Sequence, residues 1–476
     1  MLRYLQFFIS IACFLACSSH QPPQEEIADT TTANTTIAVQ PVKDSFPKGS
    51  IITQVICKND ATQSYALYIP VAHDNAPMPV MYCFDPHGDG ALPLKNYQAL
   101  ADAFHFILIG SNNSKNGNDW NTTQNIWNML SNDTQSRLLL VNTNRIYTCG
   151  FSGGAKVAGF IATHQSYIKG VIAAGAPLPE DAPVGNLPFT FTGMAGRGDM
   201  NMTDLIALNS ELDKTNTPHQ LILFNGKHAW PPVQAMRIAF EGLQLNAMRT
   251  NLINKNDTLI RAFVTQMNRE ADSAVAAKNL IAAQQTCELS IHMLQGLSSA
   301  TDAFTKKEKT ITESPAYQQQ LQIAQQLLAA EQQQKQVFQQ QFEQGDLQYW
   351  TTTINELMAK AKAPTAEGAM YQRLLAYLSL AFYSISNQLL QNNQNEAAQH
   401  FVTLYKMADA TNPEAWYFSA MLDARSSNTK TAEADLLKAA TNGFTDTARM
   451  LQQPEFQTLS PQINFSLIES KMKQVD

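Results

Sequence analysis

The sequence lacks basic stretches and long hydrophobic runs. Its 33 lysines and arginines are outnumbered by 40 acidic residues, which gives a net charge of −7, and no basic run is placed to follow a phosphate backbone. We therefore exclude nucleic acid as a partner. The 44% of hydrophobic residues is typical of globular rather than disordered protein, and a length of 476 residues predicts two or three domains.

Cysteine is also scarce, with six residues in the whole chain. Cys57, Cys83 and Cys149 fall inside predicted strands, where a free cysteine behaves as a small apolar core residue. No spacing among the cysteines demands a disulfide, so none is predicted.

The N-terminal apolar run, residues 4–16, is too short to span a bilayer. It follows Arg3 and ends at Ala16-Cys17, and this ending resembles the lipobox of bacterial lipoproteins. The resemblance implies a signal peptide over residues 1–16 and lipid attachment to Cys17; Cys13 is the weaker candidate because it would shorten the apolar run. Residues 17–47 are rich in Gln, Pro, Thr and Asn and predict a flexible tether. We expect an exported protein that is lipid-anchored to the outer membrane or cell envelope.

Short apolar runs alternate with helical patterns between residues 48 and 250, which we predict to form one domain. Strands are predicted at residues 51–57, 64–69, 80–84, 106–109, 146–149, 170–174, 189–192 and 220–224. Helices are predicted at residues 94–104 and 203–212, around Trp120 and Trp127, and from Ala155 onward. Two leading strands followed by this alternation predict an α/β fold with a doubly wound, mostly parallel sheet and one antiparallel end. Reacting groups gather at the carboxyl ends of such strands.

The pattern G-x-S-x-G occurs where the fifth predicted strand meets its helix, at Gly150, Ser152 and Gly154. Strand, tight turn and helix are the context in which this pattern forms a nucleophile elbow, with Ser152 in a strained backbone conformation. The alternative is a glycine-rich turn with an incidental serine.

A serine nucleophile needs a base that is itself oriented by a third group. His228 is the best base, because it follows the last predicted strand in a loop fixed by glycine and prolines. Asp199 follows the strand before it and is the predicted acid, in the order Ser152, Asp199, His228. Asp204 is the rival acid, although a carboxylate early in a helix has a sufficient structural role.

The oxyanion formed in acyl transfer needs hydrogen-bond donors. We predict the backbone N–H of Gly153 and a second donor from Gly88 or Asp89, in the glycine-rich loop after the third strand. Asp85, His87 and Asp89 alternate in this loop, but three such residues on a flexible loop with no fourth ligand are a weak metal pattern, and no metal is predicted.

Three stretches together resemble the α/β-hydrolase superfamily: residues 150–154, the His87-Gly88 pair, and Gly-Lys-His-Ala-Trp-Pro at residues 226–231. The last resembles the G-x-H-x-W-P stretch of the branch that contains polyhydroxybutyrate depolymerases and feruloyl esterases. The resemblance covers about residues 50–245 and implies hydrolysis of carboxylic esters by a serine triad, without metal or organic cofactor. Two residues depart from the family pattern: Pro86 stands where an apolar residue is usual, and Asp89 places a carboxylate beside the expected oxyanion.

Aromatic side chains suggest where a substrate would bind. Trp120, Trp127 and Trp230 are candidates to line an acyl pocket, with core packing as the alternative, and His87 is a further candidate contact. The loop at residues 112–118 is a candidate for binding polar groups of the substrate.

The second half of the chain predicts helices only. Residues 251–365 form a helical region that includes a glutamine-rich helix, and residues 366–476 resemble degenerate tetratricopeptide repeats without their Trp-Leu-Gly signature. Such a domain binds a protein partner or caps the hydrolase.

Together these features predict an exported serine hydrolase that cleaves carboxylic esters through an acyl-enzyme. Two alternatives stay open from the sequence. One is a non-catalytic binding lipoprotein with a hydrolase-like scaffold, and the other is a serine peptidase with the same triad.

Overall fold

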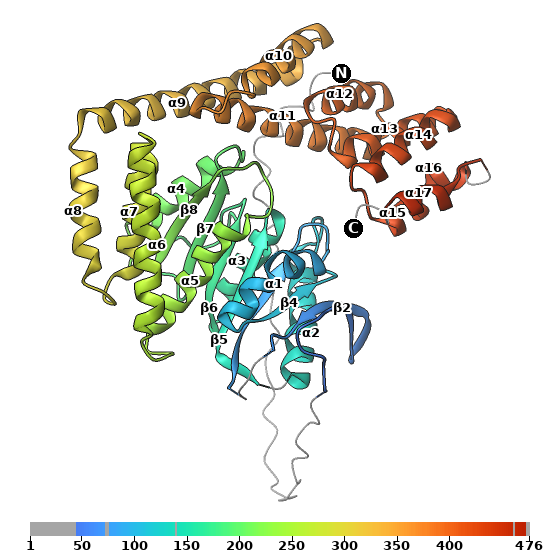
Figure 1. Ribbon diagram of the computed structural model, residues 1–476. Helices are drawn as coiled ribbons and strands as arrows, with labels where there is room; N and C mark the ends of the chain where they lie inside the picture. Colours follow the sequence, from blue (N-terminus) through green and yellow to red (C-terminus); the bar gives the residue numbers. More distant parts are fainter. Residues whose placement is uncertain (1–43, 72–75, 139, 460–461, 473–476) are drawn as a thin grey trace, which may run out of the picture. The chain divides into compact units, whose positions relative to one another are not determined.

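The computed structural model describes residues 44–71, 76–138, 140–459 and 462–472 (Figure 1). The predicted signal peptide, the lipidation candidates Cys13 and Cys17, and the tether up to residue 43 lie outside the described residues. Among the residues that are described, no helix is both long enough and apolar enough to cross a membrane.

Eight strands form one sheet. In chain order they are β1 (Ile51–Cys57), β2 (Asp60–Tyr68), β3 (Met78–Phe84), β4 (Ile107–Ser111), β5 (Val141–Phe151), β6 (Ile168–Ala174), β7 (Thr190–Gly196) and β8 (His219–Phe224). Their order across the sheet is β1-β2-β4-β3-β5-β6-β7-β8. β1 and β2 pair antiparallel, as do β2 and β4, while β4, β3, β5 and β6 run parallel. The predicted mostly parallel sheet with an antiparallel end is confirmed.

The strand order reverses at β3. The chain continues from β3 to its neighbour β4 on one side and then crosses back to β5 on the other side. β3 and β5 pair in register with Cys83 opposite Cys149 and Phe84 opposite Gly150, so both strands end at the same level. A crevice at the carboxyl ends of strands on either side of such a reversal is where open α/β sheets bind ligands.

Five helices accompany the strands. They are α1 (Ala91–Phe104), α2 (Trp120–Arg137), α3 (Gly153–His164), α4 (Met202–Leu212) and α5 (Val233–Arg249). α1, α2, α3 and α4 are at the predicted places, whereas α5 has no counterpart among the predicted elements.

The two faces of β3 contact different helices, since neighbouring side chains of a strand point in opposite directions. Tyr82 contacts Trp127 of α2 at 4.8 Å between ring centroids, and its hydroxyl bonds Thr134 of the same helix. Cys83 is on the other face of the strand and lies near Tyr97 of α1. Burial, and to a smaller extent the nearby thiols, raise the pKa of Tyr97. Helices therefore cover both faces, as continuous apolar strands require.

The second half is entirely helical in its described part. Its helices are α6 (Asp257–Ala276), α7 (Leu280–Leu294), α8 (Ala300–Thr312), α9 (Pro315–Gln344), α10 (Leu347–Lys360), α11 (Ala366–Gln391), α12 (Asn395–Ala408), α13 (Pro413–Arg425), α14 (Thr429–Thr441), α15 (Thr447–Gln452), α16 (Pro454–Thr458) and α17 (Phe465–Met472). Side-chain caps start many of them; for example, Ser314 accepts the Tyr317 N–H ahead of α9, and Asp346 accepts the Tyr349 N–H ahead of α10.

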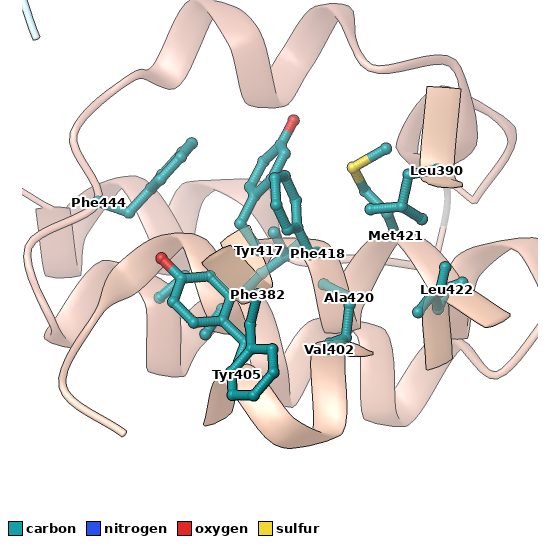
Figure 2. Packing of buried hydrophobic residues seen from close by; sticks show 14 of the residues in the cluster. Phe382, Leu390, Val402, Tyr405, Tyr417, Phe418, Ala420, Met421, Leu422 and Phe444 are labelled. Atoms are coloured by element: carbon teal, nitrogen blue, oxygen red, sulfur yellow. The ribbon is translucent and has the colours of Figure 1, made fainter. Parts of the chain in front are cut away.

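Helices α9 to α17 contribute to one apolar core, and Figure 2 shows part of it. Tyr417 of α13 stacks on Phe444 at 4.7 Å, and Tyr383 of α11 stacks on Phe418 of α13 at 5.4 Å. Aromatic stacking thus joins segments that are not consecutive in the chain, and the same cluster extends to Phe338 of α9 and Trp350 of α10. Whether the helices are true tetratricopeptide repeats stays a prediction.

The chain divides into two compact units, each made of three segments. In the described part of the chain, the first unit contains the residues up to Thr192, Glu211–His219 and Met236–Asn254, and the second contains Gly193–Ser210, Gln220–Ala235 and the residues from Lys255 onward. The loops that follow β7 and β8 therefore belong to the same unit as the helical half.

Candidate active site

Ser152 occupies a sharp turn between β5 and α3. Its φ of 53° and ψ of −121° lie in a region that a non-glycine residue adopts only under strain. Its N–H donates to the carbonyl of Ala174 at the end of β6, at 2.8 Å, which helps to hold the turn. The side chain is half-buried. This strand-turn-helix geometry is that of a nucleophile elbow.

The two glycines of G-x-S-x-G are required because backbone passes close to both. A Cβ on Gly150 would lie 2.6 Å from the N of Ala155 and still closer to the carbonyl of Gly154. A Cβ on Gly154 would lie 2.6 Å from the carbonyl carbon of Phe84 and 3.3 Å from the N of Asp85. The elbow is thus pressed against the end of β3 and the start of the candidate oxyanion loop.

Asp199 and His228 form a hydrogen-bonded pair in the second unit. The distance from Asp199 Oδ1 to His228 Nδ1 is 2.9 Å, and the two side chains are 1% and 19% exposed. Asp199 Oδ1 also accepts the N–H of Asn201, at 2.9 Å. A buried carboxylate on Nδ1 leaves Nε2 as the imidazole nitrogen that can take and give a proton.

The rival acid Asp204 is in a different environment. It lies exposed in the first turn of α4, where a carboxylate interacts favourably with the positive end of a helix. In contrast, Asp199 Oδ2 is buried and has no hydrogen-bond partner among the described residues. Unpaired buried oxygens are uncommon in structural positions and are tolerated at functional ones.

The candidate oxyanion donors differ in whether their backbone N–H groups already make a hydrogen bond. Gly153 is the first residue of α3, and its N–H makes no hydrogen bond to a described residue. The Gly88 N–H donates to the Asp85 carbonyl at 3.1 Å, in a turn where Gly88 has a φ of 80°. The N–H of Asp89 makes no hydrogen bond within the described part of the chain. Of the two residues predicted from this loop, Asp89 therefore has the available N–H.

The carboxylates of this loop are held by backbone N–H groups. Asp89 Oδ1 accepts from Ala91 and Leu92 at the start of α1, at 3.1 and 3.0 Å. Asp85 is buried, and its Oδ1 accepts the His87 N–H at 2.8 Å. The His87 side chain is 76% exposed, with Nδ1 3.5 Å from Asp85 Oδ1. Because the Asp89 carboxylate is turned to a helix start, its charge is partly offset there.

Asn116 is a neighbour of the elbow that the sequence did not single out. Its side-chain Oδ1 occupies the space that a Cβ on Gly153 would fill, and its backbone N–H donates to the Pro86 carbonyl at 2.8 Å. One residue of the loop after β4 therefore touches both the elbow and the loop after β3. The available signal was the polar composition of residues 112–118, which identifies the loop but not the residue.

The tryptophans have different roles. Trp127 is 1% exposed and packs in the core against Tyr82 and Phe84, so the core-packing alternative holds for this residue. Trp120 is 36% exposed and stacks on Phe160 of α3, with 4.6 Å between ring centroids. Trp230 is half-buried, two residues after His228. Trp120 and Trp230 stay candidates for substrate contact.

No family model matches the chain, and no curated protein matches it. Among solved structures it is similar to FphF, a fluorophosphonate-binding serine hydrolase of Staphylococcus aureus, at 14% identity over 41% of this chain and 99% of that chain, with a TM-score of 0.34. It is similar to an esterase of the archaeon Pyrobaculum calidifontis at 12% identity, covering 42% and 85% of the two chains, with a TM-score of 0.33. A third similarity is to the feruloyl esterase module of Clostridium thermocellum, at 11% identity, 40% and 85% coverage and a TM-score of 0.33. The strand order of the sheet and the strand-turn-helix geometry at Ser152 define an α/β-hydrolase-like fold.

Proposed function

We propose that the protein is a serine hydrolase that cleaves carboxylic esters. The observation that carries the proposal is the strained backbone of Ser152 at a strand-turn-helix elbow. A φ of 53° at a serine is costly, and such strain is maintained where it exposes a nucleophile. The Asp199–His228 hydrogen bond supplies the second element, an oriented base.

In the proposed reaction, the Ser152 hydroxyl attacks the ester carbonyl while His228 Nε2 takes its proton. Asp199 holds the imidazole in the tautomer with a proton on Nδ1 and stabilises the imidazolium that forms. The N–H of Gly153, and that of Asp89 as second donor, stabilise the oxyanion. His228 then gives the proton to the leaving alcohol, and water activated by the same imidazole hydrolyses the acyl-enzyme.

A fluorophosphonate probe tests this proposal because it reacts covalently with activated serines. We expect the full chain to be labelled and the Ser152→Ala variant not to be, while the Ser166→Ala control, which removes an exposed serine from the same unit, is labelled like the wild type. The proposal is overturned if the two variants are labelled equally, or if the folded wild type is not labelled at all. Turnover of p-nitrophenyl acetate against a matched p-nitroanilide separates esterase from peptidase.

We further propose export and lipid anchoring through Cys17. Radiolabelled palmitate should be incorporated into the full-length precursor expressed in a bacterium and into its Cys13→Ala variant, but not into Cys17→Ala. Incorporation that is lost with Cys13 and kept without Cys17 would place the anchor at the earlier cysteine.

A further inference from the structure

The loop between β7 and α4, which carries Asp199, is bonded to helices of the second half of the chain. The carbonyl oxygen of Arg197 accepts a hydrogen bond from Arg373 Nη1 of α11, at 2.6 Å. The Arg197 side chain donates from Nη2 to Gln285 Oε1 of α7, at 2.8 Å. Burial, and after it the nearby Arg373 charge, lower the pKa of the Arg197 guanidinium. All of these residues belong to the second unit.

Gly198, the next residue in the loop, lies close to α11. A Cβ at this position would lie 2.5 Å from Gln372 Oε1 and 3.1 Å from the carbonyl of Gly226. Gln372 is itself fixed, because its Nε2 donates to the Ala361 carbonyl at 3.0 Å. Residues on either side of one peptide bond, between Arg197 and Gly198, are thus in contact with α11.

Arg373 reaches this peptide as part of a buried ion pair. Its Nε donates to Glu331 Oε2 of α9 at 2.8 Å, and its Nη2 lies 2.6 Å from the same oxygen. The side chains of Arg373 and Glu331 are 5% and 1% exposed. Lys335 Nζ lies 3.0 Å from the second oxygen of Glu331. A buried ion pair offsets its desolvation cost only with good geometry and satisfied donors. Here all three guanidinium nitrogens have partners, so the direction of Nη1 is fixed.

The peptide between Arg197 and Gly198 is held at both ends. Its oxygen accepts from Arg373, and its N–H donates to the Gly226 carbonyl at 2.8 Å. Because a peptide unit is planar, fixing both groups fixes its rotation. The next residue in the chain is Asp199, and Gly226 is two residues before His228. This peptide therefore lies directly before the acid in the chain and is hydrogen-bonded to the loop that carries the histidine.

We propose that Arg373 is a positioning residue for the Asp199–His228 pair, so that the helical half forms part of the catalytic apparatus. The proposal rests on the roles given above to Asp199 and His228. A displacement of about 1 Å in a catalytic group costs on the order of 10²-fold in rate. Loss of the Arg373 contact should therefore lower kcat about 10²-fold and leave KM unchanged, since no substrate group touches Arg373 in this scheme.

The chain offers a matched control with the same bonding pattern. Arg425 donates from Nε to Glu455 at 2.8 Å and from Nη1 to the main-chain carbonyl of Leu390 at 3.0 Å. The test compares Arg373→Met/Glu331→Gln with Arg425→Met/Glu455→Gln, because each double variant removes both charges of its arginine–glutamate pair. In the first double variant Lys335 also loses its carboxylate partner, so Arg373→Lys, which keeps Glu331, is needed beside it. Arg373→Lys, which keeps the charge but loses the planar fork, is the second variant and should recover part of kcat.

Three readouts are taken on the full chain: kcat and KM for p-nitrophenyl acetate, the thermal unfolding midpoint, and the downfield proton resonance of the His228 Nδ1–H in ¹⁵N-histidine-labelled protein. We expect the Arg373 variants to lose kcat and to lose or shift this resonance, while the Arg425 variant keeps both. Equal kcat and an unchanged resonance in both double variants overturn the proposal. Arg373→Met/Glu331→Gln could fail to fold without contradicting the proposal. In that case the proposal is overturned if Arg373→Lys has the kcat and the His228 resonance of the wild type.

The resonance also separates this proposal from the proposed function. If the wild type shows no turnover that depends on Ser152, the hydrolase proposal fails, and the His228 resonance still reports whether Arg373 positions the pair. A resonance that responds to Arg373 without any turnover would support positioning in a protein that is not an active hydrolase.

Discussion

Adding a single methyl group at Gly154 tests the contact between the elbow and β3. Gly154 lies in the first turn of α3, where replacing glycine by alanine would otherwise stabilise the helix by about 0.5–1 kcal/mol. The new Cβ would lie 2.6 Å from the carbonyl carbon of Phe84, a separation that real Cβ atoms essentially never show. Overpacking of this kind costs about 1–3 kcal/mol, and the neighbour here is strand backbone, which cannot rotate away.

We therefore expect Gly154→Ala to destabilise the protein by about 1–2 kcal/mol, which lowers an unfolding midpoint by roughly 2–4 °C per kcal/mol in a domain of this size. Esterase activity should fall too, because the elbow must move away from β3.

Two other glycines provide the controls. A Cβ on Gly185 meets nothing within 4 Å, so Gly185→Ala should be neutral or slightly stabilising. A Cβ on Gly153 meets only the side-chain amide of Asn116, which can rotate away, so Gly153→Ala should fall between the other two. The assay is thermal unfolding followed by circular dichroism, together with p-nitrophenyl acetate turnover. A midpoint for Gly154→Ala equal to or above that of Gly185→Ala would refute the close approach of the elbow to β3.

Two further predictions concern the acid and the thiols. Asp199→Asn should lower kcat for p-nitrophenyl acetate by about 10⁴-fold by favouring the wrong imidazole tautomer, whereas Asp204→Asn should leave it unchanged; the reverse result would transfer the acid role to Asp204. Burial raises the pKa of both Cys57 and Cys287 to about 11, so these thiols stay protonated at pH 8. A thiol reagent at pH 8 should modify Cys57 and Cys287 slowly in the native protein and completely after unfolding. Rapid modification of these two cysteines in the folded protein would contradict their buried positions.

The strands of the sheet could be predicted because each is a short apolar run bounded by turn residues. The antiparallel end follows from two leading strands joined by the turn at Lys58 and Asn59. The helix α5 was missed, since Gly242 in its middle weakens the helical pattern and two prolines precede it. For Trp127 the sequence leaves core packing and an acyl pocket open, because an aromatic residue has the same sequence signature in a core and in a binding site.

In the candidate site, only the residues that directly follow a strand could be predicted from the sequence. Serine, acid and histidine each follow a strand, and the carboxyl ends of parallel strands share one edge of the sheet. Contacts between distant segments leave no such pattern. Arg373 and Arg197 are separated by 176 positions, and the sequence around Arg373 is an ordinary amphipathic helix. Asn116 is one of several polar residues in its loop, so its place beside Gly153 appears only when the fold is known.

The division into two units bears on the role proposed for the helical half, which sequence repeats alone do not suggest. A separate binding module would be joined to the hydrolase by a linker with few contacts across it. Here the segments at residues 193–210 and 220–235, which carry Asp199 and His228, form one compact unit with the helices. The bonds from Arg373 to Arg197 and from Arg197 to Gln285 show how that unit is held together at the acid loop. Under the proposal made for Arg373, the helical half supports the Asp199–His228 pair instead of being an appended domain.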